Sequence, residues 1–297
     1  MTQPVFIGID VGTSSIKVVA VDPDGKLLAV ASSPMTVSVD RPGWSEQQPE
    51  EWWVGTCSSI RQVLAEIDSP EVLGVGLSGQ MHSLVALDSA RAVVRPAILW
   101  NDVRSSAEAA YVRETVGSES LRRLAGNPAL EGFTVTKLLW MKQNEPGLFE
   151  RVSHMLLAKD YIRYRLTGEL GTDPSDASAT LLFDIVKSRW SDEMCDLLDI
   201  DSDLLPPVVE SAEIAGGVTK TASNETGLAP GVPVVGGGAD NACAAVGAGV
   251  VSRGDALFSV GTSGTVVAPT DSPVTDPGMR IHSMRHAIPS TWYLMGV

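Results

Sequence analysis

The sequence predicts a mixed α/β fold, and three features of the chain predict it. Over the first 100 residues, short apolar runs of strand length alternate with a longer stretch of helical periodicity. Residues 104–205 are mostly helical in pattern, and strand-like runs return from residue 232 onward. One short motif, Val-Gly-Thr-Ser, begins at residue 11 and again at residue 260, each time between two strand-like runs. This repeat predicts two related lobes that each begin with the same hairpin.

Length, composition and charge indicate a globular protein and argue against several classes of partner. The chain has 297 residues, 44% of them hydrophobic, which is enough for about two globular domains with their own cores. Its net charge of −14 argues against a nucleic-acid partner and against an anionic membrane surface. Three scattered cysteines make neither a disulfide framework nor a zinc site, and no signal peptide or apolar span is evident. We therefore expect a cytoplasmic protein.

In the first third of the chain, the sequence pattern predicts several strands and one helix. Strands are expected at Val5–Ile9, Ile16–Val21 and Leu27–Ser32, with a Pro- and Gly-containing turn between the last two. A helix is expected over residues 45–66, followed by further strands at Val72–Leu77, Leu84–Leu87 and Ala97–Leu99.

The rest of the chain is helical and then returns to strands. Helices are expected over Phe133–Asn144 and over His154–Thr167, with Gly168 as the C-cap of the second. A strand at Val232–Val235 leads through three glycines into a helix at Asn241–Val246. A hairpin at Ala256–Ala268 and a strand-like run at Trp292–Val297 complete the expected elements.

The two repeated loops are candidate phosphate sites. Glycine and hydroxyl residues between two strands can form a nest of backbone N–H groups around phosphate oxygens. Asp10 precedes the first loop, whereas Ser259 stands at the equivalent place before the second. A single carboxylate suits a magnesium ion that is also held by water and phosphate. The alternative is that both loops are ordinary hairpin turns whose hydroxyls cap their own backbone.

Asp240 is the second candidate acid, because it follows a strand and three glycines at the start of a helix. It can act as a general base, and the glycines would let a substrate approach the backbone. The alternative is a simple N-cap.

Two further segments follow predicted strands, where ligands of α/β folds usually bind. Met81 and His82 follow one strand, and Trp100-Asn101-Asp102 follows another and offers donors and acceptors for a polyol. The alternatives are a structural histidine and a turn with an Asx cap.

Several segments together resemble the FGGY carbohydrate kinases, and the resemblance covers essentially the whole chain. These segments are Gly8-Ile9-Asp10-Val11-Gly12-Thr13-Ser14, Pro42-Gly43-Trp44-Ser45-Glu46-Gln47, Gly79-Gln80-Met81-His82, Ile98-Leu99-Trp100-Asn101-Asp102, Lys137-Leu138-Leu139-Trp140, Lys159-Asp160-Tyr161, Thr172-Asp173-Pro174-Ser175-Asp176-Ala177-Ser178 and Gly237-Gly238-Ala239-Asp240-Asn241. The Gly-Gln-Met-His segment is similar to that of family members that phosphorylate xylulose. The chain departs from the family pattern at Ser83, Val103 and Ala239, where glycine is usual, and the first two bear on the choice of sugar.

The resemblance implies a fold, a reaction and a set of site residues. The implied fold is that of the actin–hexokinase superfamily, with two ribonuclease-H-like lobes and with ATP and sugar in the cleft between them. Asp10 would be the catalytic, magnesium-linked acid and Asp240 the catalytic base. Met81, His82, Trp100, Asp102 and Asn241 would bind the sugar, and Gly12, Thr13, Ser14, Lys17, Gly261, Thr262 and Ser263 would bind the phosphates of ATP. The implied reaction is ATP-dependent phosphorylation of a ketopentose, D-xylulose to D-xylulose 5-phosphate. The alternatives are a sugar-binding or regulatory protein without turnover, or a kinase for another ketose or polyol.

Family members are longer than this chain, so the resemblance also implies a division of it. Residues 1–246 would form the N-terminal sugar-binding lobe, and residues 247–297 would begin the C-terminal nucleotide-binding lobe. We expect the first lobe to have a self-contained core. Strands after residue 250 would expose an apolar face, so we expect homodimers or aggregates and negligible kinase activity from the chain alone.

Overall fold

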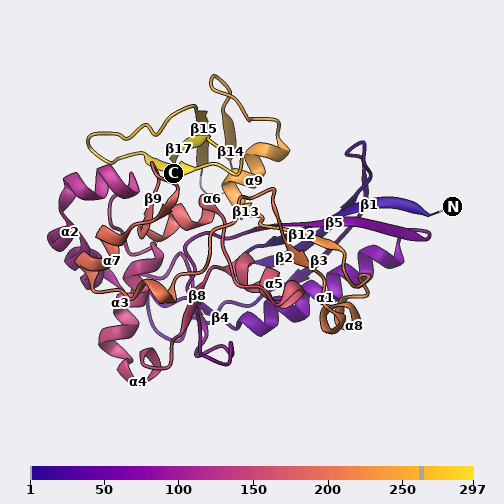
Figure 1. Cartoon of the computed structure of the whole chain (residues 1–297), viewed down its shortest axis with the longest axis horizontal. Helices are drawn as coiled ribbons and strands as arrows, with labels where there is room; N and C mark the ends of the chain where they lie inside the picture. The colour runs from indigo at the N-terminus through magenta and orange to yellow at the C-terminus, as the bar shows by residue number, and fades with distance from the viewer. Residues whose placement is uncertain (1, 261–263) are drawn as a thin grey trace.

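The structure is a computed structural model that describes residues 2–260 and 264–297. In Figure 1 a large sheet lies at the right, a mostly helical segment at the left, and the last strands along the top. The strands are β1 (Gln3–Val11), β2 (Ser15–Val21), β3 (Leu27–Pro34), β4 (Glu46–Gln47), β5 (Pro70–Gly79), β6 (Val85–Leu87), β7 (Ala97–Ile98), β8 (His154–Leu156), β9 (Phe183–Asp184), β10 (Arg189–Trp190), β11 (Ile214–Gly217), β12 (Pro233–Val235), β13 (Gly238–Ala239), β14 (Leu257–Val260), β15 (Gly264–Thr270), β16 (His282–Arg285) and β17 (Trp292–Gly296). The helices are α1 (Pro49–Ala65), α2 (Ser106–Ser120), α3 (Thr134–Asn144), α4 (Pro146–Phe149), α5 (Ala158–Thr167), α6 (Pro174–Ala177), α7 (Asp192–Leu198), α8 (Lys220–Thr226) and α9 (Asp240–Gly247), with the short turns η1 (Leu121–Ala125), η2 (Ser178–Thr180) and η3 (Ser202–Leu204).

The large sheet has seven strands, and β5 is the strand that organises the site. The order is β11-β12-β5-β1-β2-β3, and β13 also pairs with β5. β1 runs parallel to β5 on one side, while β12 and then β13 run parallel to it on the other. Because the carboxyl ends of parallel strands meet at one edge of a sheet, the residues that follow β1, β5 and β13 lie close together.

One face of this sheet is covered by helices. α1 packs on β2 and β3, and it also contacts α5 and α8. Alternate residues of β1, such as Ile7 and Ile9, are buried in the same apolar cluster as Trp52 and Ile60 of α1 and Ile162 of α5. This alternation is what a strand with one face on a core requires. The mixed α/β class predicted from the sequence is confirmed.

The C-terminal strands form a second, antiparallel sheet in the order β14-β15-β17-β16. One of its faces is buried, because Val267, Met284 and Tyr293 belong to the apolar cluster of the helical segment. The expectation of a self-contained core is therefore wrong for the helical segment, because residues after 247 complete its apolar cluster. The apolar cluster of the large sheet does lie entirely within the first lobe. On the other side of the C-terminal sheet, Phe258 and Val260 are 68% and 87% exposed, as expected for an apolar face left open.

Two predicted helices begin later than expected, for the same physical reason. Glu46–Gln47 pairs with β7, so α1 begins only at Pro49, where proline suits the first helical turn. His154–Leu156 pairs with β6, so α5 begins at Ala158. A strand partner far away in the sequence overrides the local helical pattern in both places.

Most other expected elements are confirmed within a few residues. Both predicted hairpins form, β2–β3 with Gly25 in the left-handed region and β14–β15 at the second copy of the repeat. Gly168 ends α5 at φ 78°, as a C-cap glycine should. Within the described residues, no helix has both the length and the apolar character that crossing a membrane requires.

Candidate active site

The two acids predicted to do chemistry lie on either side of β5. Asp10 of β1 is level with Ser78 of β5, and Ala239, just before Asp240, is level with Gly79. Two strand spacings separate the two positions, about 10 Å across the sheet edge. The two acids therefore stand at the same sheet edge, on opposite sides of the end of β5.

Asp240 is the first residue of α9, and the N-cap is Ala239. Its Oδ1 accepts hydrogen bonds from the backbone N–H of Asn241 at 2.6 Å and from the Asn241 side chain at 2.8 Å. Burial is the main cause that raises its pKa to about 6; the Asn241 bonds oppose the rise and Asp10 adds to it. Such a carboxylate is mostly ionised at pH 7 and still basic enough to accept a proton.

The three glycines before Asp240 lie so close to other parts of the chain that a Cβ at these positions would clash with them. A Cβ at Gly237, which has φ 78°, would lie 2.7 Å from the carbonyl oxygen of Leu77. A Cβ at Gly236 would lie 2.6 Å from the carbonyl oxygen of Glu210. The chain's own packing therefore already requires glycine at positions 236 and 237. That these glycines also let a substrate approach stays a prediction.

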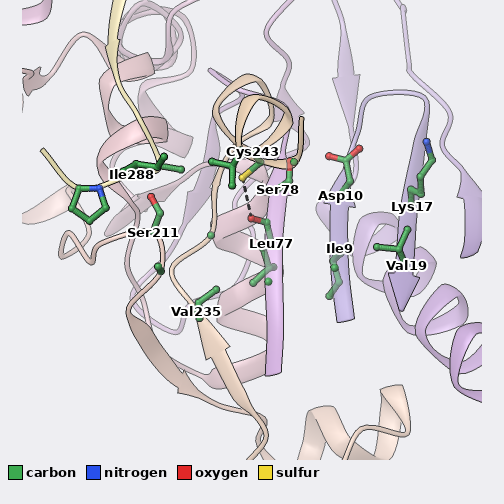
Figure 2. Close-up of a pocket in the computed structure, with 18 residues that line it drawn as sticks. Ile9, Asp10, Lys17, Val19, Leu77, Ser78, Ser211, Val235, Cys243 and Ile288 are labelled. Atoms are coloured by element: carbon green, nitrogen blue, oxygen red, sulfur yellow. Dashed lines mark hydrogen bonds between the residues drawn. The ribbon is translucent and has the colours of Figure 1, made fainter. Parts of the chain in front are cut away.

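Asp10 and Lys17 share the wall of a cavity of about 730 Å³. They are paired across β1 and β2, so their side chains lie on the same face, and Figure 2 shows them pointing toward the same end of the sheet. The rest of the wall is mainly apolar and includes Leu77, Val235 and Ile288. The cavity thus places one carboxylate and one ammonium at the mouth of an apolar hollow.

The first repeated loop is braced by other parts of the chain. Thr13 Oγ1 donates to Gln80 Oε1 at 3.1 Å and accepts from Trp100 Nε1 at 2.9 Å. The Gln47 side chain donates to the Thr13 carbonyl at 2.8 Å, and a Cβ at Gly12 would lie 2.9 Å from the carbonyl oxygen of Ser15.

The Thr13 hydroxyl therefore holds neighbouring elements, whereas the alternative interpretation had it capping its own turn. Ser14 is exposed on the same loop. The second loop, Gly261-Thr262-Ser263, lies outside the described residues.

Met81 brings the C-terminal sheet into contact with the site. Its sulfur accepts a contact from Asn241 Nδ2 at 3.6 Å and one from the hydroxyl of Tyr293 at 3.9 Å. Tyr293 is completely buried, and burial together with Asp240 raises the pKa of its hydroxyl. Tyr293 was not among the predicted site residues, because a tyrosine in a strand-like run carries no signal of what it faces.

His82 is held neutral and in one orientation. Its Nδ1–H donates to the carbonyl of Ala179 at 2.7 Å, and its ring packs edge-on against Phe133. Burial and then the nearby Lys137 ammonium lower its pKa to about 3. With Nδ1 donating, the neutral ring keeps Nε2 as a hydrogen-bond acceptor. His82 has φ 68°, an uncommon backbone conformation for a side chain of this size.

Asp102 is completely buried among charged and aromatic side chains. Its oxygens accept from Arg104 Nη2 at 2.6 Å, from Arg104 Nε at 2.9 Å and from the backbone N–H of Ser45 at 2.6 Å. The Arg104 guanidinium also lies over the ring of Trp44, 3.6 Å from its centroid. This geometry favours a role in holding the loop that carries Trp100, which is itself half-exposed. That Asp102 contacts a sugar stays a prediction.

A second buried charge cluster lies behind Asp240. Lys159 Nζ contacts Asp160 at 2.6 Å, Asp173 at 2.9 Å and Asp176 at 3.3 Å, and all four side chains have no exposed surface. Burial would lower the pKa of Lys159, but the three carboxylates together raise it. We call these four residues the Lys159 cluster. They belong to segments that carry the family resemblance, yet no pattern in the sequence showed that they meet.

Comparison with known proteins was made at the level of family, sequence and structure. Residues 5–247 match the N-terminal domain of the FGGY family of carbohydrate kinases. The chain is 40% identical over 292 residues to a xylulose kinase of Escherichia coli, covering 98% of this chain and 60% of that protein. It is 40% identical over 293 residues to a xylulose kinase of Bacillus subtilis, covering 98% of this chain and 58% of that protein.

A solved structure described as a xyloylose kinase from Brucella ovis has 38% identity and a TM-score of 0.93. That match covers 98% of this chain and 60% of the other. The chain thus spans about 60% of the length of the relatives that it matches.

Proposed function

Because the chain belongs to the FGGY family of carbohydrate kinases, we propose that its protein transfers the γ-phosphoryl group of ATP to a ketopentose. The proposed acceptor is D-xylulose, and the proposed product is D-xylulose 5-phosphate. The relatives of known name at about 40% identity support this acceptor, since they are xylulose kinases. A cytoplasmic location, inferred from three free cysteines, belongs to the same proposal.

The observation that carries the proposal is the Asp240 carboxylate at the edge of β5. Among the described residues, no lysine or arginine forms an ion pair with it, and its pKa of about 6 lies near the working range of a general base. Asp240 would take the proton of the attacking sugar hydroxyl. The hydroxyl oxygen then forms a bond to the γ-phosphorus while the bond between that phosphorus and the ADP oxygen breaks.

Charge neutralisation would come from the other side of β5. Lys17 and the backbone N–H groups of Thr13 and Ser14 would contact phosphate oxygens, while the Gly12 N–H donates to the Ser15 carbonyl at 3.1 Å and closes the turn. Asp10 fits a magnesium ion, because Mg²⁺ is usually held by one or two carboxylates together with phosphates and water. When bound, the ion would offset phosphate charge. Within the described residues, no group of three or more acidic, histidine or cysteine side chains could hold a metal ion.

The sugar would lie against Met81, His82, Trp100 and Asn241. The neutral ring of His82 offers Nε2 as an acceptor, so it would take a hydrogen bond from a sugar hydroxyl. Asn241 can donate or accept, and the exposed indole of Trp100 provides an apolar wall. Asp102 would act on the sugar through the loop that it holds.

Two measurements test the proposal. Titration calorimetry of the 297-residue chain with xylulose, ribulose and glycerol should show tighter binding of the ketopentoses, by about 1–3 kcal/mol for the His82 hydrogen bond. A hybrid enzyme, in which residues 1–297 replace the matching segment of a xylulose kinase relative, should release ADP on addition of xylulose. Binding of ketopentoses without ADP release from a folded hybrid would favour a sugar-binding protein instead, and tighter binding of glycerol would contradict the proposed acceptor.

A further inference from the structure

A chain of hydrogen bonds connects the Lys159 cluster with the residue before Asp240. Asp173 Oδ1 faces the Lys159 ammonium at 2.9 Å. Its other oxygen, Oδ2, accepts from the Ser175 hydroxyl at 2.5 Å, from the Ser175 backbone N–H at 2.9 Å and from the Ser211 hydroxyl at 2.7 Å. Asp173 is thus fully engaged and has a fixed orientation.

This arrangement decides what the Ser175 oxygen can do. A hydroxyl has one donor hydrogen and two acceptor lone pairs, and Asp173 takes the hydrogen. The oxygen is left as an acceptor, and the backbone N–H of Ala239 donates to it at 2.9 Å. Ser175 and Ala239 are 64 positions apart, so this bond joins two distant parts of the chain.

The Ala239 N–H belongs to a very short, buried strand whose position the Ser175 bond helps to fix. β13 consists of two residues that pair only with the last part of β5, and Ala239 has no side chain that could cap α9. Asp240 comes directly after it and begins the helix. A shift of Ala239 would therefore move the Asp240 carboxylate with it.

We propose that Asp173 and Ser175 are positioning residues, which aim the Asp240 carboxylate by fixing the backbone N–H of Ala239. This inference rests on the proposed function only in naming Asp240 as the base. The Lys159 ammonium orients Asp173, Asp173 orients the Ser175 hydroxyl, and that hydroxyl holds the start of α9. The energetic support comes from burial, because a charge-assisted hydrogen bond is stronger and more directional where water is excluded.

A matched control stands three residues away. Ser178 is equally buried, donates to the Pro174 carbonyl at 2.7 Å and accepts the backbone N–H of Arg285 at 3.0 Å. Ser178→Ala therefore also removes a hydroxyl that accepts a distant backbone N–H, but it frees β16, whereas Ser175→Ala frees β13. Ser175→Ala in addition removes a hydrogen bond to the Asp173 carboxylate. A difference between the two variants reports on Asp240 and not on stability in general.

The test uses NMR on the 297-residue chain, with the Asp240 carboxyl followed by ¹³C titration and the Ala239 amide by hydrogen exchange. Asp10, Asp176 and Tyr293 face Asp240 in both variants, so their influence cancels in the comparison. In Ser175→Ala we expect faster hydrogen exchange at the Ala239 amide. The Asp240 pKa should fall from about 6 toward the ordinary value of about 4 as water reaches the carboxylate.

In Ser178→Ala the exchange rate of the Ala239 amide and the pKa of Asp240 should stay at their wild-type values. Ser175→Cys, with a weaker acceptor of similar shape, should give an intermediate result and serves if the alanine variant does not fold.

The hybrid enzyme provides the second readout. Ser175→Ala should lower kcat about 10–100-fold, because a misplaced base costs rate, while the KM for xylulose changes by no more than about twofold. Unchanged Asp240 titration in Ser175→Ala, or equal shifts in both alanine variants, would overturn the inference. A wild-type hybrid that does not phosphorylate xylulose would contradict the proposed function alone, since the titration still decides the role of Ser175.

Discussion

Asp240, which is half-buried, and Asp102, which is completely buried, are two carboxylates of the same chain in opposite electrostatic environments. Asp102 has Arg104 against both of its oxygens and a backbone N–H in addition. Within the described part of the chain, no cation pairs with Asp240, whose partners are the neighbouring Asn241 groups. A buried charge that is paired contributes to the architecture, whereas one that is left unpaired has a shifted pKa and is available for chemistry. The difference separates a structural acid from a reactive one.

The largest expected effect is on turnover. Asp240→Asn keeps the shape of the side chain and removes its ability to accept a proton. In the hybrid enzyme we expect kcat to fall by about 10²–10⁴-fold with sugar binding largely retained, measured by coupled ADP release and calorimetry. Near-normal turnover would mean that Asp240 only begins its helix.

The next effect is on stability and belongs to the paired acid. Asp102→Asn leaves the buried Arg104 guanidinium with Glu46, 2.6 Å from its Nη1, as its only carboxylate partner among the described residues. We expect a loss of about 2–4 kcal/mol in urea unfolding. The control is Asp199→Asn, which removes an ion pair with Lys142 from an exposed carboxylate and should leave stability unchanged. A small loss for Asp102→Asn would place Asp102 among the residues free to bind a ligand.

Asp240→Asn should stabilise the chain at pH 7. The folded pKa of about 6 exceeds the unfolded value of about 3.9, so the folded state binds the proton more tightly. Wild-type stability relative to the variant should therefore fall as pH rises from about 4 to about 6 and stay constant on either side. We expect the variant to gain about 1–3 kcal/mol above pH 6, measured by urea unfolding across this range. A constant difference between the two proteins would show that the carboxyl is not perturbed by folding.

The smallest effect concerns geometry alone. Arg104→Lys keeps the positive charge beside Asp102 but loses the planar fork and the stacking on Trp44. We expect a loss of about 1–2 kcal/mol in the same unfolding assay, less than for Asp102→Asn. Equal losses would mean that shape, and not charge, holds this cluster.

The sequence alone was sufficient for the elements whose patterns are local. Short apolar runs of strand length placed β1, β2 and β5, and the Pro- and Gly-containing turn placed the first hairpin. It was also sufficient to nominate Asp10, which directly follows a predicted strand, and Asp240, which follows a strand and three glycines at the start of a predicted helix. Family resemblance added roles for these residues, and the family match supports that resemblance.

Only the tertiary structure showed which segments, distant in the sequence, contact one another. Residues 45–48 and 154–156 leave the helical pattern because distant strands pair with them or hold them. The same holds for Tyr293 against Met81 and for Ser175 against Ala239, which are contacts between segments 64 or more positions apart. Local sequence determines backbone preference, but burial, pKa and hydrogen-bond partners depend on which segments meet, and that is a property of the whole packed chain.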